Sequence, residues 1–202
     1  MKNMKRLLAV MLALVLVCGV LPMTTHAAES ENPYNGNVHF GYVIGGETPI
    51  LLDRNDRYLS VNAGTPTVHR TEPDNWCANY NRETGVLTLK DYNGPQIRLD
   101  TVPGDFTVKL IGTNVINSPT SIGNRNYGIQ KTNSSGAFII TADEAATLTI
   151  NVTGSEGQVA HGIDMNIQGW KDCSFTLGGK AHLIVNAQAV TADYSTGAVG
   201  IY

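Results

Sequence analysis

Three aromatic residues outside the alternating apolar positions are the side chains best suited to recognise a ligand. Trp170 lies in a turn between a glycine and a lysine, and Tyr127 and Tyr194 also lie apart from the alternating positions. An aromatic ring packs against the apolar face of a sugar, and a loop tryptophan with polar neighbours is typical of binding surfaces. We therefore take Trp170, Tyr127 and Tyr194 as candidate substrate-binding residues. For Trp170, packing along the side of the fold is an equal alternative.

The acidic residues form no pattern typical of a glycosidase, which needs two convergent carboxylates. Only two of them in the second half, Asp143 and Glu144, are close in sequence, and adjacent residues on a strand point to opposite faces. Asp164, Asp172 and Asp193 are isolated. No arginine follows Arg125, so a basic residue for a lyase reaction is also lacking. We predict no catalytic residues and no enzymatic activity.

The histidines indicate neither a triad nor a metal site. His161 falls at the position that Tyr127 and Val199 occupy in neighbouring segments, which favours a structural role. The Gly-Asp nonapeptide that binds calcium is absent. Isolated Asp and Asn residues in turns could still supply oxygen ligands, although such residues mostly bond their own backbone. We predict no metal or cofactor and leave calcium open.

The first 27 residues have the three parts of a secretory signal peptide. Basic residues at Lys2, Lys5 and Arg6 precede an apolar run, and Ala27 ends a stretch with small residues for cleavage. The apolar run of about 15 residues is shorter than the roughly 20 that a membrane span needs. We predict a secreted or extracellular protein, associated with the cell surface or free, with no membrane span after signal removal.

Charge and composition exclude several classes of protein. Removing the leader leaves 11 basic and 17 acidic residues, a net charge of −6, which argues against a nucleic-acid partner. Only 15% of all residues are charged, too few for a coiled coil or a disordered chain. Two cysteines remain, Cys77 and Cys173, and either a single bridge or two buried thiols would fit.

Two sequence markers recur with nearly the same period. Gly-Ile pairs place glycines at 128, 162 and 200, which are 34 and 38 residues apart. Aliphatic-Asn pairs end at Asn117, Asn151 and Asn186, which are 34 and 35 residues apart. Short alternating runs such as 106–110 and 147–152 lie between them. Two independent markers with one period indicate repeated structure.

Stacked repeats of short strands favour a right-handed parallel β-helix, a solenoid whose coils rise by the strand spacing of about 4.8 Å. In that fold Ile129, Ile163 and Ile201 would stack in the core. Two antiparallel immunoglobulin-like sandwiches are the alternative, but a sandwich gives no reason for a 34-residue register. We expect a signal peptide at 1–27, a polar lead-in at 28–37, N-terminal cap strands at 38–85 and β-helix repeats at 86–202. The last repeat marker stops at Tyr202, so we expect a solenoid cut short at its C-terminus.

From about residue 38 onward the chain resembles secreted bacterial right-handed parallel β-helix repeat proteins of the carbohydrate-binding-domain type. The segments that carry the resemblance are 80–89, 91–94, 110–114 and 127–129. Their motifs are structural, so the resemblance implies the fold more directly than an activity, and it assigns no ligand residue. It implies a non-catalytic module that binds polysaccharide or cell-wall glycan. The alternatives are a structural adhesin or stalk segment of a larger surface protein, and a polysaccharide lyase-like enzyme.

Overall fold

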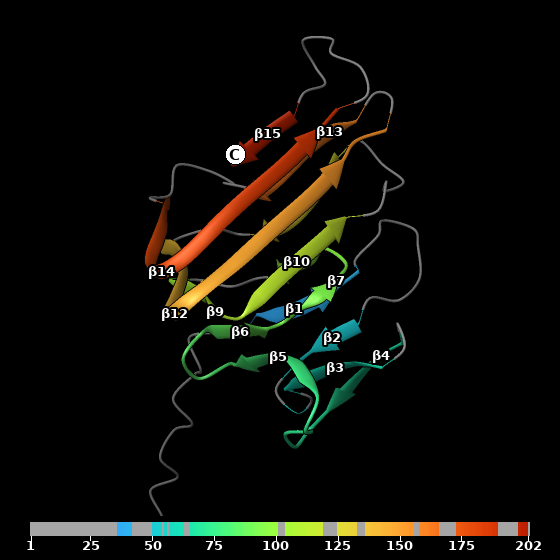
Figure 1. Ribbon diagram of the computed structural model, residues 1–202, viewed down its shortest axis with the longest axis vertical. Coiled ribbons are helices and arrows are strands. Elements are labelled where there is room, and N and C mark those ends of the chain that lie inside the picture. Colours follow the sequence, from blue (N-terminus) through green and yellow to red (C-terminus); the bar gives the residue numbers. More distant parts are fainter. Residues whose placement is uncertain are drawn as a thin grey trace, which may run out of the picture. The chain divides into compact units, whose positions relative to one another are not determined.

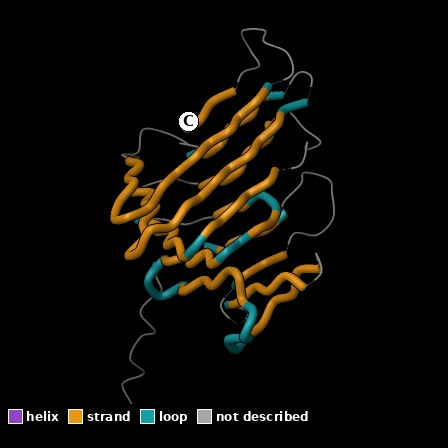
Figure 2. The backbone as a smooth tube through the Cα atoms, in the orientation of Figure 1, coloured by secondary structure: helices purple, strands orange, loops and turns teal. Residues whose placement is uncertain are grey.

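A computed structural model describes the chain from residue 36 to residue 201, with gaps. The described residues are 36–41, 50–53, 55, 57–62, 65–100, 104–118, 125–132, 136–155, 158–165, 173–189 and 198–201. The chain divides into two compact units, Met1–Glu31 and Asn32–Tyr202, and every described residue belongs to the second. The expected signal peptide and the lead-in before residue 36 therefore lie outside the described residues. Figure 2 shows strands joined by loops, and the described part of the chain contains no helix.

Two mixed β-sheets form a curled half-barrel (Figure 1). The six-stranded sheet has the order β15 (Ala198–Ile201), β13 (Val159–Asp164), β11 (Arg125–Lys131), β8 (Ile97–Asp100), β1 (Asn37–Phe40), β2 (Ile50–Leu52). The nine-stranded sheet has the order β4 (Thr65–His69), β3 (Tyr58–Asn62), β5 (Trp76–Asn81), β6 (Val86–Lys90), β9 (Phe106–Ile111), β12 (Gly136–Thr153), β10 (Thr113–Ser118), β7 (Asn93–Gly94), and β14 (Cys173–Gln188) pairs with β12.

The prediction of a right-handed parallel β-helix is wrong. Strand β1 pairs antiparallel with β2 and β8, β3 with β4 and β5, and β5 with β6. Both sheets are therefore mixed. A tight turn explains one of these reversals. Asn81 Oδ1 accepts the backbone N–H groups of Glu83 and Thr84, at 3.0 and 3.2 Å, and Gly85 follows with φ = 65°. This turn sends β6 back along β5 as a hairpin, because an Asn side chain that bonds its own backbone and a glycine with positive φ favour chain reversal.

The second half of the chain pairs in parallel with the spacing of the sequence markers. Ile129 on β11 pairs with Ile163 on β13, which pairs with Ile201 on β15. Ile129 and Ile163 are fully buried, as expected, but Ile201 is 40% exposed because β15 is the last strand of its sheet. The expected cap segment 38–85 forms β1 to β5, which pair into the same two sheets.

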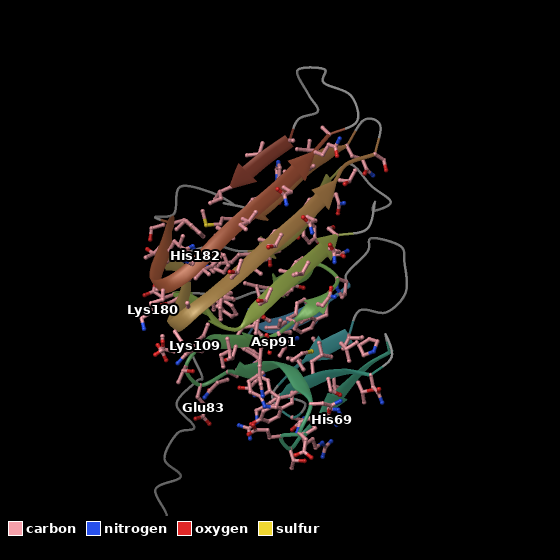
Figure 3. All side chains as sticks on the ribbon, viewed as in Figure 1. His69, Glu83, Asp91, Lys109, Lys180 and His182 are labelled. Atoms are coloured by element: carbon pink, nitrogen blue, oxygen red, sulfur yellow. The ribbon has the colours of Figure 1, made fainter. Side chains whose placement is uncertain are left out.

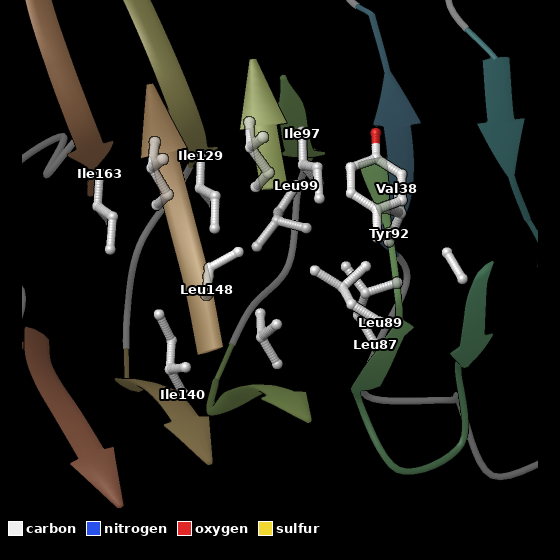
Figure 4. Close-up of a cluster of buried hydrophobic side chains, with 14 of the residues drawn as sticks. Val38, Leu87, Leu89, Tyr92, Ile97, Leu99, Ile129, Ile140, Leu148 and Ile163 are labelled. Atoms are coloured by element: carbon white, nitrogen blue, oxygen red, sulfur yellow. The ribbon is translucent and has the colours of Figure 1, made fainter. Parts of the chain in front are cut away.

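The core lies between the two sheets and contains aligned rows of apolar side chains. Figure 4 shows Ile97, Ile129 and Ile163 of the six-stranded sheet facing Leu148 and Ile140 of the nine-stranded sheet. An aromatic row crosses four strands, with ring centroids 6.0 to 6.3 Å apart, and contains Tyr80, Phe106, Phe138 and Phe175. In-register parallel pairing aligns the three phenylalanines, since β9, β12 and β14 place them at paired positions, and Tyr80 on β5 extends the row.

Two buried asparagines satisfy backbone groups where the chain turns. Asn114 Oδ1 accepts the N–H of Tyr92 at 3.0 Å, and its Nδ2 donates to the carbonyls of Ile111 and Thr147. Asn126 donates from Nδ2 to the carbonyl of Thr153 at 2.8 Å and accepts the hydroxyl of Ser118. These amides hold the turns because buried backbone groups without partners are costly.

Candidate functional site: the outer face of the parallel strands

Four asparagines form a continuous hydrogen-bonded row across the outer face of the nine-stranded sheet. Asn186 donates from Nδ2 to Oδ1 of Asn151 at 2.8 Å, and Asn151 donates to Asn117 at 2.9 Å. Asn117 donates in turn to Oδ1 of Asn93 at 3.4 Å. All three bonds run in the same direction. We call this row the asparagine ladder; its members lie on β14, β12, β10 and β7.

Strand alternation and parallel register place these amides outside. The residue before each of the three later asparagines is apolar and points into the core: Ile116, Ile150 and Val185. Because side chains alternate along a strand, the asparagines that follow must point to the outer face. The register pairs Asn117 with Asn151 and Asn151 with Asn186, which brings the amides within hydrogen-bonding distance.

Each interior amide of the ladder keeps hydrogen-bonding capacity toward solvent. An Asn side chain has two N–H donors and two acceptor lone pairs, and one of each is used within the ladder. Asn117 and Asn151 therefore retain one donor and one acceptor each, repeated at the strand spacing of about 4.8 Å. A partner with regularly spaced hydroxyl groups could accept a hydrogen bond from the remaining donor of each amide and donate one to its remaining acceptor.

Uncharged side chains flank the ladder. In one row, Thr147 pairs with Thr113 on one side and His182 on the other. In a second row, Thr149 pairs with Val115 and Ile184. His182 is exposed (Figure 3), and Ile184 is 48% exposed. The face thus offers hydroxyls, amides and some apolar surface in a regular array, and it carries no carboxylate at these positions.

A separate polar cluster lies on the six-stranded sheet. Arg98 donates from Nε and Nη2 to Asp100 Oδ1 at 3.1 and 3.0 Å, and the hydroxyl of Thr132 donates to the same oxygen at 2.9 Å. His39 Nε2 lies 3.6 Å from Asp100 Oδ2. Burial lowers the pKa of His39, and this effect outweighs the opposing attraction of Asp100. These contacts join β1, β8 and the residue after β11 on one side of the sheet.

Sequence analysis missed a contact of His161. Its Nδ1 lies 3.7 Å from Asp164 Oδ2, which also accepts a hydrogen bond from Gln130 Nε2 at 3.1 Å. Asp164 is fully buried and His161 is 4% exposed. The i,i+3 spacing on a strand gave no signal for this contact, because such residues normally point to opposite faces. Within the described residues, no three His, Cys, Asp or Glu side chains gather as a metal site would require.

The structure describes one of the three candidate binding residues. Tyr127 lies on β11, paired with His161, and is only 8% exposed, which leaves little ring surface for a sugar. Trp170 and Tyr194 lie outside the described residues, so their placement as candidates is unchanged. The sequence signal that could have identified the ladder was the repeated aliphatic-Asn pair, which we interpreted only as a repeat marker.

The adjacent acids Asp143 and Glu144 form separate ion pairs. Lys109 Nζ lies 2.6 Å from Asp143, and Lys180 Nζ lies 2.9 Å from Glu144 (Figure 3 labels both lysines). Both acids are exposed and point toward different strands, an arrangement unlike the convergent pair of a glycosidase. Asp172 and Asp193 lie outside the described residues. Cys77 and Cys173 are free thiols, each half-buried.

Comparison of the chain with protein-family models, curated proteins and solved structures finds no match. Among the residues that the structure describes, there is no helix long and apolar enough to cross a membrane. The geometry of the described residues must therefore support any functional assignment by itself.

Proposed function

We propose that this protein is a secreted or cell-surface, non-catalytic module that binds polysaccharide along the asparagine ladder. The observation that carries the proposal is the uninterrupted row of four amides, each hydrogen-bonded to the next. The leader expected at 1–27 supports export from the sequence.

The chemistry of the face matches a neutral chain of sugars. The free donor and acceptor of each interior amide can engage neighbouring hydroxyl groups, and Thr147 and Thr149 add hydroxyls on the same side. Ile184 and Val115 offer apolar surface for the C–H groups of a sugar ring. Since a net hydrogen bond contributes only about 1 kcal/mol, several contacts in series are needed, and the ladder supplies them.

The experiment is affinity electrophoresis of the folded protein in gels that contain neutral or acidic polysaccharides. Replacing two ladder amides, Asn117→Ala with Asn151→Ala, should weaken binding by about 10- to 30-fold, at about 1 kcal/mol for each amide. The matched control is Thr107→Ala with Thr141→Ala, outward residues on β9 and β12 away from the ladder.

Retention that the ladder variant leaves unchanged would contradict this site. The control variant should migrate like the parent, because it removes two hydroxyls from the same sheet without touching the amides. No retardation in any gel would favour the alternative function of a structural adhesin or stalk segment. Turnover of any of these polysaccharides would favour the lyase-like alternative.

A further inference from the structure

The two interior amides of the ladder, Asn117 and Asn151, each have a ladder neighbour on both sides. Strand β10 lies between β7 and β12, and β12 lies between β10 and β14 (Figure 1). Asn151 accepts a hydrogen bond from Asn186 on β14 and donates one to Asn117 on β10. Asn117 in turn donates to Asn93 on β7. In both interior amides, therefore, the accepting carbonyl and the donated N–H point toward opposite neighbours along the row.

This arrangement determines which groups of each interior amide remain for a ligand. A primary amide is planar, and of its two N–H groups only the one trans to the oxygen points opposite to the carbonyl. The ladder bonds therefore use that N–H and one lone pair of the oxygen. The second N–H and the second lone pair lie side by side on the amide edge farthest from Cβ. Since Cβ points out of the sheet, that edge faces away from the strands.

A donor beside an acceptor selects a ligand that carries the complementary pair. Asn and Gln side chains use this edge when they bind N6 and N7 of adenine through two hydrogen bonds. The excess of acidic over basic residues argues against a nucleic-acid ligand here. In a neutral sugar the matching pair is two hydroxyl groups on adjacent ring carbons, of which one accepts from the N–H and the other donates to the oxygen. Hydroxyls on either side of a substituted ring carbon are too far apart to meet both groups of one amide.

We propose that the asparagine ladder recognises vicinal diols of neutral glycans and therefore prefers 1,4-linked to 1,3-linked hexose chains. This inference rests on the proposed binding of polysaccharide along the ladder and specifies its substrate class. In a 1,4-linked chain every inner sugar keeps hydroxyls at the adjacent positions 2 and 3. In a 1,3-linked chain the linkage occupies position 3, and the hydroxyls left at positions 2 and 4 are not adjacent.

The row beside the ladder fits the remainder of such a sugar. Val115 and Thr149 lie two residues before the interior amides on the same strands, and Ile184 continues their row on β14. Side chains two residues apart on a strand share a face and are about 7 Å apart. A ring whose diol edge meets an amide can therefore pack its C–H groups on the aliphatic carbons of this row. The row carries no charge, so it offers a carboxylate no counter-ion.

The test is titration of the folded protein with two pentasaccharides of glucose, cellopentaose and laminaripentaose. Both are neutral and β-linked, and they differ only in being 1,4-linked and 1,3-linked. At each interior amide that a sugar engages, the 1,3-linked chain loses one of two hydrogen bonds, a change of about fivefold in Kd. Cellopentaose should therefore bind about 5- to 30-fold more tightly, for one or two amides engaged.

The double variant Asn117→Ala with Asn151→Ala should bind the two pentasaccharides with nearly equal affinity, because the groups that distinguish them are gone. The matched control, Thr107→Ala with Thr141→Ala, should keep the preference of the parent, since these outward residues of β9 and β12 lie away from the ladder. As a second measurement, NMR signals of the Asn117 and Asn151 side-chain amides in the parent should shift with cellopentaose at concentrations where laminaripentaose has little effect. This measurement tests the proposal even if a variant fails to fold.

The possible failures separate this inference from the proposed function. Equal affinity of the parent for both pentasaccharides, weakened alike in the ladder variant, would overturn the diol preference and leave polysaccharide binding at the ladder. A preference for cellopentaose that the ladder variant retains would overturn the inference, because another part of the chain would then read the linkage. Binding of neither pentasaccharide, together with no retardation in any polysaccharide gel, would contradict the proposed function and this inference with it.

Discussion

The Nδ2 of Asn186 donates to the Oδ1 of Asn151 at 2.8 Å, although the two residues are 35 positions apart in the chain. The bond forms because β12 and β14 pair in parallel and in register over almost their whole length. The same register packs Phe138 against Phe175 on the inner face, with ring centroids 6.1 Å apart. One spacing in the sequence therefore determines both the core of the parallel region and the chemistry of its outer face.

Replacing Ile163 with Asp should destabilise the fold severely. Ile163 is fully buried in the core between Ile129 and the facing sheet, and an aspartate there would have to stay charged without a partner or be protonated. We expect a loss of about 3 kcal/mol or more in the free energy of unfolding, measured by urea denaturation. Ile184→Asp, at an outward position that is 48% exposed, should cost far less. Equal losses in the two variants would contradict the burial of Ile163.

Two glycines in one row should respond differently to the same substitution. A Cβ at Gly162 would collide with the side chain of Val185 and the carbonyl oxygen of Gly200, whereas a Cβ at Gly200 would meet nothing within 4 Å. Gly162→Ala should therefore destabilise the fold by about 1–3 kcal/mol, the usual cost of overpacking. Gly200→Ala should be near neutral. Thermal melting of both variants beside the parent tests the close approach of β13 to β14.

The recurring markers predicted the rows of the parallel region but not the mixed sheets. Ile129, Ile163 and Ile201 pair as their spacing indicated. The antiparallel strands were missed because their direction depends on turns such as the one after Asn81, where one side chain bonds two backbone groups. The markers with the 34-residue period do not occur in the segment that forms the antiparallel strands, so they carry no information about the direction of those strands.

The candidate site was only partly predictable for a related reason. Asparagine is most often a turn residue, and we interpreted the Asn at 117, 151 and 186 only as markers of a repeat. In the structure they lie within strands and bond one another. Alternation alone places them outside, but hydrogen bonding between them also requires parallel in-register neighbours, which no local pattern reveals. The contact of His161 with Asp164 depends in the same way on tertiary packing.

Protonation of His39 should make stability depend on pH. Burial lowers the pKa of His39 in the folded state below the ordinary histidine value of 6.5, so the unfolded chain binds more protons than the folded chain in this range. The free energy of unfolding should therefore fall as pH drops from above 6.5 toward and through the folded-state pKa. Urea denaturation at several pH values measures this slope. His39→Gln should reduce it, and a variant with the full slope of the parent would assign the effect to another group.

Replacing Trp170 with Ala should weaken polysaccharide binding by about 1–3 kcal/mol, by analogy with the stacking of nucleic-acid bases on aromatic side chains. The physical reason is that amides and hydroxyls gain little from any single contact, so an aromatic ring must supply apolar area. Affinity electrophoresis of Trp170→Ala beside the Asn117, Asn151 double variant compares the two contributions. If Trp170→Ala is retarded as strongly as the parent in the same gel, this residue does not belong to the site, and the ladder remains the proposed site.

Net charge should select between neutral and acidic polysaccharides. Outside the leader expected at 1–27, the chain carries 17 acidic and 11 basic residues, so a polyuronate is repelled at long range and a neutral glycan is not. The ladder itself adds no positive charge that would attract a carboxylate. We therefore expect neutral glycans to bind equally well with and without a chelator, and uronates to bind only when calcium bridges carboxylates on both sides. Parallel gels with added calcium or with chelator measure this difference, at low salt, where long-range repulsion is strongest. Strong retention of a polyuronate in the presence of chelator would contradict the charge argument.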